Sequence, residues 1–327
     1  MENRRPSGAI AATSAAFARM KHILFHPFDA GKWFVLGFTA FLASLFDGSG
    51  GGNGGGGDYG DSFGTSGEGE DSPGPISGEE VKETVAGWIG TAKQWIADNP
   101  EIVTGITVAL LFVLAIVFVL FWVRCRGKFL FLDNVVQNRA LVAHPWRTYR
   151  RQGNSLFWWS TIYGFIALGL FLGTAGGIGF YVYSVLGDGG SWNMTATLIT
   201  ILMGGVFLVL WILLAYISMA LEDFVTPLMY RDYLTTTEAW GKFLQLQNRN
   251  LFRFFGYAIW KFVLSLGIGL GLLIVGIATC CIGLILMAIP YIGAVFLLPV
   301  SVFVRSIGPE YLAQFGEEYD VFHLEQR

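Results

Sequence analysis

Charged residues are scarce in this sequence. Asp, Glu, Lys and Arg make up 14% of the 327 residues, whereas they make up about 25% of a typical soluble domain. Hydrophobic residues account for 54%. This composition excludes an ordinary soluble domain and indicates a polytopic membrane protein. The formal net charge is only -3, so the distribution of charge along the chain is more informative than its total.

Cysteine and histidine are also scarce, with three and four residues respectively. Cys125, Cys280 and Cys281 lie beside or inside apolar segments and have neither metal-ligand spacing nor the pattern of a disulfide framework. We interpret them as small buried hydrophobic residues. No nucleophile and base occur as a recognisable pair. The sequence therefore predicts no metal site, no cofactor and no catalytic residues.

Positive charge is concentrated between two long apolar runs. Residues 124–157 contain seven Lys or Arg residues, and a short basic loop of this kind stays cytoplasmic under the positive-inside rule. Residues 1–32 hold five Lys or Arg, whereas residues 47–101 hold two against eleven Asp or Glu. We therefore expect residues 1–32 and residues 47–101 to lie on opposite sides of the membrane. Both termini are expected in the cytoplasm.

Apolar runs predict an all-α fold with six transmembrane helices. The first run is only 14 residues long, about 21 Å as a helix against a hydrocarbon core of about 30 Å, and its crossing is inferred mainly from the charges that flank it. The last apolar stretch is too long for one span and suits two. The six expected spans are residues 33–46, 102–123, 156–186, 194–221, 254–279 and 282–304.

Shorter segments connect these spans. Residues 47–78 contain fourteen glycines and lack both a preceding strand and a terminal Gly-Lys-Ser/Thr, so they are predicted to be a flexible acidic linker outside the cytoplasm rather than a phosphate site. Residues 124–155 and 222–253 are the expected cytoplasmic loops. Amphipathic helices are expected at the membrane surface or on a partner in residues 1–32, 79–99 and 305–327.

Two further patterns bear on packing. Gly169, Gly173 and Gly177 recur every four residues, which favours close contact between helices over the lining of a pore. Residues 152–157 and 247–252 each follow a tryptophan and share a similar polar sequence that ends in Leu-Phe. The similarity suggests a repeated unit of a surface helix followed by a helical hairpin, although chance is the alternative.

Candidate site residues gather at the expected inner ends of the spans. Glu222 and Asp223 are adjacent and are candidates for a buried polar cluster with Arg139, Arg231 or Arg305, with Asp133 as a further candidate member; a solvated helix end is the favoured alternative. The basic loop is predicted to determine topology or to contact anionic lipid headgroups, and its charge is too small for nucleic acid. The candidate lipid contacts are Arg124, Arg126, Lys128, Arg147, Arg150 and Arg151.

Three phrases carry a resemblance to known proteins: HPFDAGKWFVLGFTAFLASL (26–45), RGKFLFLDNVVQNR (126–139) with Trp146 downstream, and YLAQFGEEYDVF (311–322). They resemble a broad group of prokaryotic membrane proteins and are similar to the membrane domain found beside some glycerophosphodiester phosphodiesterases. The resemblance implies the cytoplasmic membrane of a prokaryote and no established activity. A phosphodiesterase barrel needs a few hundred residues, and 23 residues follow Val304, so we expect no catalytic barrel in this chain.

The main functional hypothesis is an accessory or scaffold component of a membrane assembly, whose partners are the bilayer and a protein at the cytoplasmic surface. The alternative is a transporter or channel for an apolar or lipid-like solute, with a cavity lined by Thr174, Thr197 and Thr200 or by the residues around Pro290. An enzyme is the third hypothesis. A solidly packed inner side with an exposed apolar patch would favour the scaffold.

Overall fold

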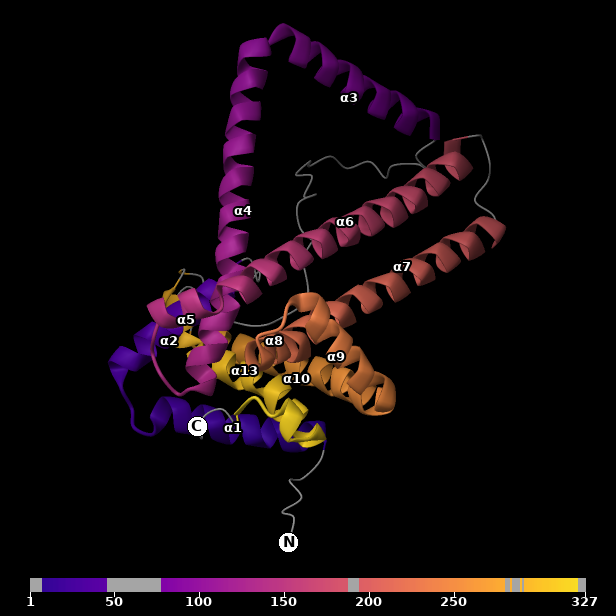
Figure 1. Ribbon diagram of the computed structural model, residues 1–327. Helices are drawn as coiled ribbons and strands as arrows, with labels where there is room; N and C mark the ends of the chain where they lie inside the picture. The colour runs from indigo at the N-terminus through magenta and orange to yellow at the C-terminus, as the bar shows by residue number, and fades with distance from the viewer. Residues whose placement is uncertain are drawn as a thin grey trace. The chain divides into compact units, whose positions relative to one another are not determined.

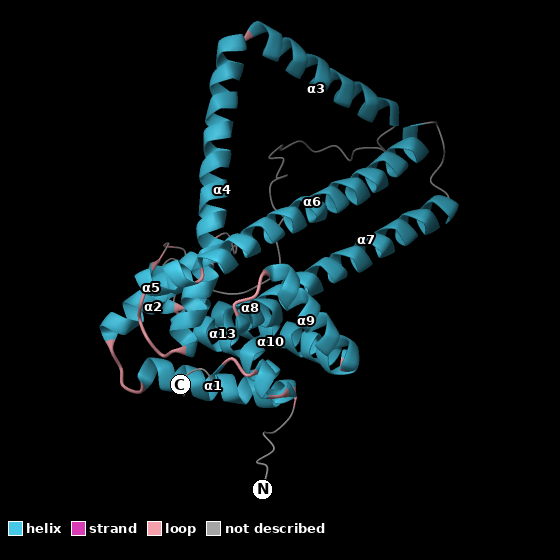
Figure 2. Cartoon of the chain, in the orientation of Figure 1, coloured by secondary structure: helices cyan, strands magenta, loops and turns pink. Residues whose placement is uncertain are grey.

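The computed structural model describes residues 8–45, 78–187, 194–279, 283, 289 and 291–322. All regular elements in these ranges are helices, and no strand occurs in them (Figure 2). The α-helices are α1 (Ala9–Phe25), α2 (Ala30–Ala43), α3 (Gly78–Asp98), α4 (Pro100–Val136), α5 (Ala143–Thr148), α6 (Arg150–Gly187), α7 (Met194–Ala220), α8 (Thr226–Asp232), α9 (Thr236–Arg249), α10 (Leu251–Ala278), α12 (Ile292–Phe296) and α13 (Leu298–Leu312). A π-helix, η1 (Leu221–Val225), joins α7 to α8, and two 3-10 turns, η2 (Ala313–Phe315) and η3 (Glu317–Tyr319), follow α13.

The chain divides into two compact units. The first, called here the helical body, comprises Met1–Gly57, Val119–Thr161 and Ala215–Arg327. The second, called the spanning unit, comprises Asp58–Phe118 and Ile162–Leu214. The long helices α4, α6 and α7 therefore contribute residues to both units.

Four described helices are long and apolar enough to cross a membrane, as in a helical membrane protein. These candidate spans are Pro100–Val136, Arg150–Val185, Met194–Asp232 and Leu251–Ala278. They cover four of the six expected spans. The expected span at residues 33–46 falls on α2, a shorter apolar helix of 14 residues. The one at residues 282–304 falls partly outside the described residues, so the count of six stays a prediction.

The spanning unit has sparse contacts between α6 and α7. The Tyr163 hydroxyl donates to the Leu214 carbonyl at 2.6 Å, while a Cβ placed on Gly169 or Gly173 would meet no described atom within 4 Å. Of the predicted glycine stripe, only Gly177 comes near α7 among the described residues, where an added Cβ would lie 3.8 Å from the Met203 side chain. The most apolar stretches of α4, α6 and α7 contain no buried residues. This exposure is expected of surfaces that face lipid.

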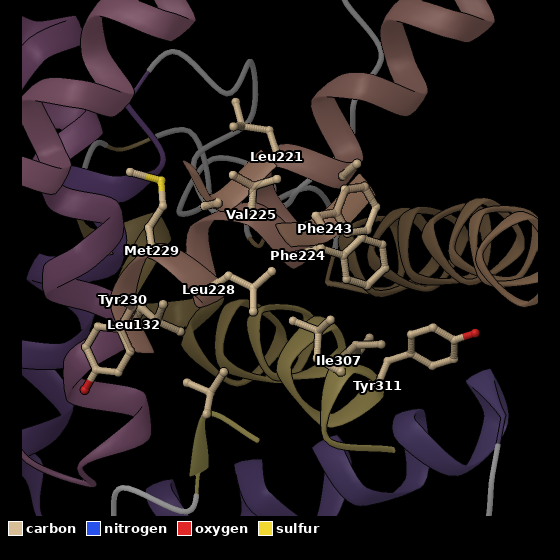
Figure 3. Packing of buried hydrophobic residues seen from close by; sticks show 14 of the residues in the cluster. Leu132, Leu221, Phe224, Val225, Leu228, Met229, Tyr230, Phe243, Ile307 and Tyr311 are labelled. Carbon is tan, nitrogen blue, oxygen red and sulfur yellow. The ribbon is translucent and has the colours of Figure 1, made fainter. Parts of the chain in front are cut away.

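The core of the helical body contains a group of packed aromatic rings, and Figure 3 shows two of them, Phe224 and Phe243, side by side among buried aliphatic side chains. The Phe224 ring stacks on Phe243 of α9 with 5.2 Å between centroids, and lies edge-on to Phe254 of α10 at 5.1 Å. All three side chains are fully buried. Because aromatic pairs add about 0.5–1.5 kcal/mol each beyond the area that they bury, this cluster fixes α9 and α10 against η1.

Local capping explains where two helices of this body begin. The Asp29 carboxylate accepts hydrogen bonds from the backbone N–H groups of Gly31 and Lys32 at 2.8 and 3.3 Å, which starts α2 at Ala30. Thr235 and Glu238 form a reciprocal capping box at the start of α9. Polar side chains thus terminate the loops that precede both helices.

The two described ends of the chain meet within the helical body. Helix α1 lies beside α13, as Figure 1 shows in indigo and yellow. The Gly8 backbone N–H donates to the Gln314 side-chain carbonyl at 2.7 Å, and the Gln314 amide donates back to the Gly8 carbonyl at 3.1 Å. The Arg19 Nε forms an ion pair with Glu310 at 2.7 Å. The two described ends of the chain therefore lie next to each other in the helical body.

The C-terminal part differs from the expected amphipathic helix at residues 305–327. Helix α13 continues without a break through Pro309 to Leu312. Two 3-10 turns follow, and Gly316 adopts a φ of 135° between them. A backbone in this region is readily adopted only by glycine, so the chain turns here and does not continue as a helix.

The two copies of the suggested repeat place their Leu-Phe pairs in different environments. In the first copy, Leu156 and Phe157 are 1% and 4% exposed. In the second copy, Leu251 and Phe252 are 54% and 94% exposed. The two Leu-Phe pairs therefore have different packing roles, and the repeat stays a prediction.

Candidate functional site

Glu222 and Asp223 lie in η1, and a close helix crossing fixes the backbone at this point. A Cβ placed on Gly308 of α13 would lie 2.2 Å from the Asp223 carbonyl oxygen, so only glycine allows α13 to pass here. The Thr226 hydroxyl donates to the Leu221 carbonyl at 2.7 Å, spanning the wider turn of the π-helix. Single π-turns inside α-helical segments occur frequently at functional sites.

Asp223 is buried and bound by two side chains from α10. The Lys261 Nζ donates to its two carboxylate oxygens at 2.8 and 2.6 Å, and the Tyr257 hydroxyl donates to Oδ2 at 2.8 Å. Asp223 and Lys261 are each 5% exposed. Tyr257 and Lys261 are four residues apart, so they project from the same face of α10. A buried ion pair with an additional hydrogen bond thus joins η1 to α10.

The neighbouring Glu222 points toward different helices. Its carboxylate forms an ion pair with Lys128 of α4, and the Arg124 Nη2 lies 3.8 Å from it. The Arg305 Nη1 of α13 donates to the Glu222 backbone carbonyl at 3.4 Å. Two consecutive carboxylates therefore hold α4 and α10 to the same π-turn.

Asp133 is the buried carboxylate of a third ion pair in the helical body. Arg139 donates to both of its carboxylate oxygens, with distances from 2.7 to 3.0 Å, and the Tyr230 hydroxyl donates to Oδ1 at 3.0 Å. The Tyr149 ring lies 4.8 Å from the Tyr230 ring. Burial, and next the neighbouring Tyr230, raises the pKa of the Tyr149 hydroxyl far above its usual value. Tyr149 therefore stays protonated at any physiological pH.

Most of the chain matches the sequence model of a protein family. A family described as a family of unknown function, DUF7544, has a model that matches residues 8–315. The chain belongs to this family. The match includes the described helical body up to η2 and therefore all three polar clusters. No curated protein and no solved structure matched the chain.

In this DUF7544 member, the structure separates the residues that the sequence grouped into one polar cluster. Asp133 and Arg139 pair with each other, and Glu222 and Arg305 meet through a backbone carbonyl. Asp223 instead pairs with Lys261, which was not among the expected partners. A signal for it existed, because Lys261 is the only charge in residues 254–304 and a lone lysine in an apolar helix needs a carboxylate partner.

Arg231 belongs to a separate contact with the C-terminal segment. Its guanidinium donates to the backbone carbonyls of Glu317 at 2.9 Å, Glu318, and Asp320 at 3.1 Å, and to the Asp232 carboxylate at 2.8 Å. These bonds hold the segment that contains η3 against α8. Two residues at its end, Val321 and Phe322, are buried as a result.

Replacing Arg231 by glutamine should release this segment. Hydrogen bonds to charged groups contribute about 1.5–3 kcal/mol each, so we expect amide exchange in residues 313–322 to accelerate roughly 10-fold or more. Hydrogen exchange with mass spectrometry measures this rate. Arg147→Gln is the matched control because Arg147 is exposed. Unchanged exchange in the Arg231 variant would show that the buried Val321 and Phe322 hold the segment without the arginine.

The six candidate lipid contacts fall into two groups. Arg126 is buried, lies 4.2 Å above the Trp122 ring and donates to Asn154 at 3.0 and 3.3 Å. Arg124 and Lys128 lie beside Glu222. The exposed members of the set are Arg147, Arg150 and Arg151. In this structure, the first three stabilise the protein, and the last three are accessible to a headgroup or a partner.

Proposed function

We propose that this chain is an accessory or scaffold component of an assembly in the cytoplasmic membrane of a prokaryote. One observation carries the proposal: the carboxylates of Asp133, Asp223 and Glu310 each pair with a cation and are at most 9% exposed. The pairs at Asp223 and Glu310 each join two different helical elements. Ionisable groups that serve a solute pathway would instead border a water-filled route.

The proposal includes six spans with both ends in the cytoplasm. The Trp33 Nε1 donates to the Val295 carbonyl at 3.0 Å, and the Tyr291 hydroxyl donates to the Phe34 carbonyl at 3.3 Å. A Cβ on Gly37 would lie 2.5 Å from the Val295 side chain. These contacts support a pairing of the first and last spans. The hydrogen bonds between Gly8 and Gln314 agree with an even number of crossings, and the basic loop favours the cytoplasmic side.

The helical body also has surfaces that suit partners. Arg147, Arg150 and Arg151 are exposed, and Trp158 in the same region is 61% exposed. Arginine beside tryptophan is typical of the membrane–water interface. The resemblance to a membrane domain found beside some glycerophosphodiester phosphodiesterases agrees with a component that has no chemistry of its own.

A transporter of apolar or lipid-like solutes is the second hypothesis, but its expected lining has no specific support. The Thr174 hydroxyl donates to the Leu170 carbonyl at 2.6 Å, and the Thr200 hydroxyl donates to the Ala196 carbonyl at 2.9 Å. Both bonds stay within their own helix, which satisfies these hydroxyls without a solute. Pro290 lies outside the described residues.

Mild detergent extraction from the native host, followed by identification of co-purifying proteins, tests the scaffold proposal. We expect a specific protein partner in near-stoichiometric amount. Charge reversal at Arg147 and Arg151 should reduce its recovery severalfold, whereas Lys93→Glu, an exposed substitution on α3, should not. Recovery of the chain alone from the native membrane under these conditions would contradict the proposal.

A further inference from the structure

The start of α10 exposes apolar and basic side chains together. Phe252 is 94% exposed and Leu251 54%, and the flanking Arg249 and Arg253 are also exposed. The apolar face continues along the helix through residues that are each more than half exposed, namely Phe255, Ile259 and Phe262. The opposite face carries the buried Phe254, Tyr257 and Lys261. One helix therefore anchors the core and presents a continuous apolar stripe that starts between two arginines.

This first turn is held in place by the helical body. The Tyr311 hydroxyl of α13 donates to the Arg253 backbone carbonyl at 2.8 Å, and the Arg253 backbone N–H donates to the Asn250 carbonyl at 3.0 Å. Within the described ranges, no carboxylate forms an ion pair with Arg249 or Arg253. Their guanidinium groups are thus positioned on a fixed backbone while their charges remain available to an external anion.

The length of α10 indicates that this anion is a lipid phosphate. Its 28 residues span about 42 Å, compared with about 30 Å for the hydrocarbon core and about 40–45 Å with the headgroups. A helix of this length that crosses the bilayer reaches headgroup level at its ends. The two arginines flank the first turn of α10, whereas its last turn contains no basic residue. On an α10 that crosses the bilayer, the arginines are at the depth of the lipid phosphates, and the exposed Phe252 is close to the upper acyl chains.

We propose that Arg249, Arg253 and Phe252 form a binding site for an anionic phospholipid at the start of α10. The arginines bind the phosphate and the negatively charged headgroup, and Phe252 packs against the upper part of the acyl chains. This site is separate from the basic loop at residues 124–155. It depends only on α10 crossing the membrane and is independent of the scaffold role.

The full-length chain in nanodiscs tests the site. The probe is a photoreactive phosphatidylglycerol with its crosslinker near the headgroup, used at a low fraction where labelling is proportional to affinity, and peptide mapping locates the product. We expect labelling of residues 249–255 to exceed that by the matching phosphatidylcholine probe. Arg249→Gln with Arg253→Gln should lower labelling of residues 249–255 by phosphatidylglycerol about 30-fold. Each basic residue contributes about 1 kcal/mol at an anionic surface. The loss of two residues therefore costs about 2 kcal/mol, which is about 30-fold at about 1.4 kcal/mol per tenfold.

Matched variants distinguish a specific lipid site from unfolding and from general attraction to basic residues. Arg249→Lys with Arg253→Lys keeps the charge and should retain most of the labelling, and an unchanged unfolding temperature of the glutamine variant shows that it did not lose labelling by unfolding. Arg150→Gln with Arg151→Gln should leave labelling at residues 249–255 unchanged, and so should added inorganic phosphate. Equal labelling by the two probes, or labelling that persists in the glutamine variant, would overturn the proposal. So would a dimer in native mass spectrometry with the first turn of α10 protected from both lipids.

Discussion

Replacing Lys261 by methionine is expected to destabilise the protein by about 3–5 kcal/mol, because it leaves Asp223 as an unpaired charge in the interior. The Asp223 carboxylate accepts hydrogen bonds from Lys261 and Tyr257, and both side chains come from α10. The loss should therefore separate α10 from η1. Unfolding in mixed micelles, followed by circular dichroism, measures the free-energy difference.

The double variant Asp223→Asn with Lys261→Met is the control for this prediction. The asparagine side chain keeps an acceptor for the Tyr257 hydroxyl and removes the buried charge, and pairs replaced together are often neutral in stability. We expect it to recover most of the loss. If the single Lys261 variant were as stable as the native protein, the ion pair would not hold α10, and apolar packing alone would fix this helix against η1.

Gly308→Ala is expected to cost about 3 kcal/mol, at the upper end of the range for overpacked interiors. The added methyl would lie 2.2 Å from the Asp223 carbonyl oxygen and 2.8 Å from its Cα. Both are backbone atoms, so α13 or η1 must move, and the contact between Asp223 and Lys261 moves with it. Thermal unfolding in detergent measures the change.

Gly241→Ala in α9 provides the matched control, since a Cβ there meets no described atom within 4 Å. Alanine is favoured over glycine inside a helix by about 1 kcal/mol, so this variant should be neutral or slightly stabilised. Equal effects of the two substitutions would mean that helix propensity, and not the close crossing at Gly308, determines the outcome.

Composition and apolar run length were enough to predict an all-helical membrane protein. Four of the expected spans correspond to candidate spans in the structure, because an apolar run of sufficient length has few alternatives to a membrane helix. The C-terminal segment was harder to predict. Pro309 suggests a helix boundary in the sequence, but α13 passes through it, and the turn at Gly316 depends on a local backbone conformation that periodicity does not reveal.

The sequence identified Asp133 and Asp223 as candidate members of a polar cluster, but it did not identify Lys261 as the partner of Asp223. Asp133 and Arg139 are six residues apart, so proximity alone suggests their pairing. Lys261 is 38 residues from Asp223, and only the packing of α10 on η1 brings them together. The role of Gly308 was also inaccessible, because a glycine in a sequence does not show which backbone crosses it. The regularly spaced glycines of α6 looked more suited to close packing, yet Gly169 has no described atom near its Cβ position.

Labelling of single cysteines at positions 70 and 150 tests most directly whether the basic loop lies in the cytoplasm, opposite the glycine-rich linker. The three native cysteines are first replaced by alanine, and the reagent is a membrane-impermeant maleimide. We predict that intact cells label position 70 and that position 150 reacts only after permeabilisation. Labelling of both positions in intact cells, or of neither before permeabilisation, would contradict this orientation.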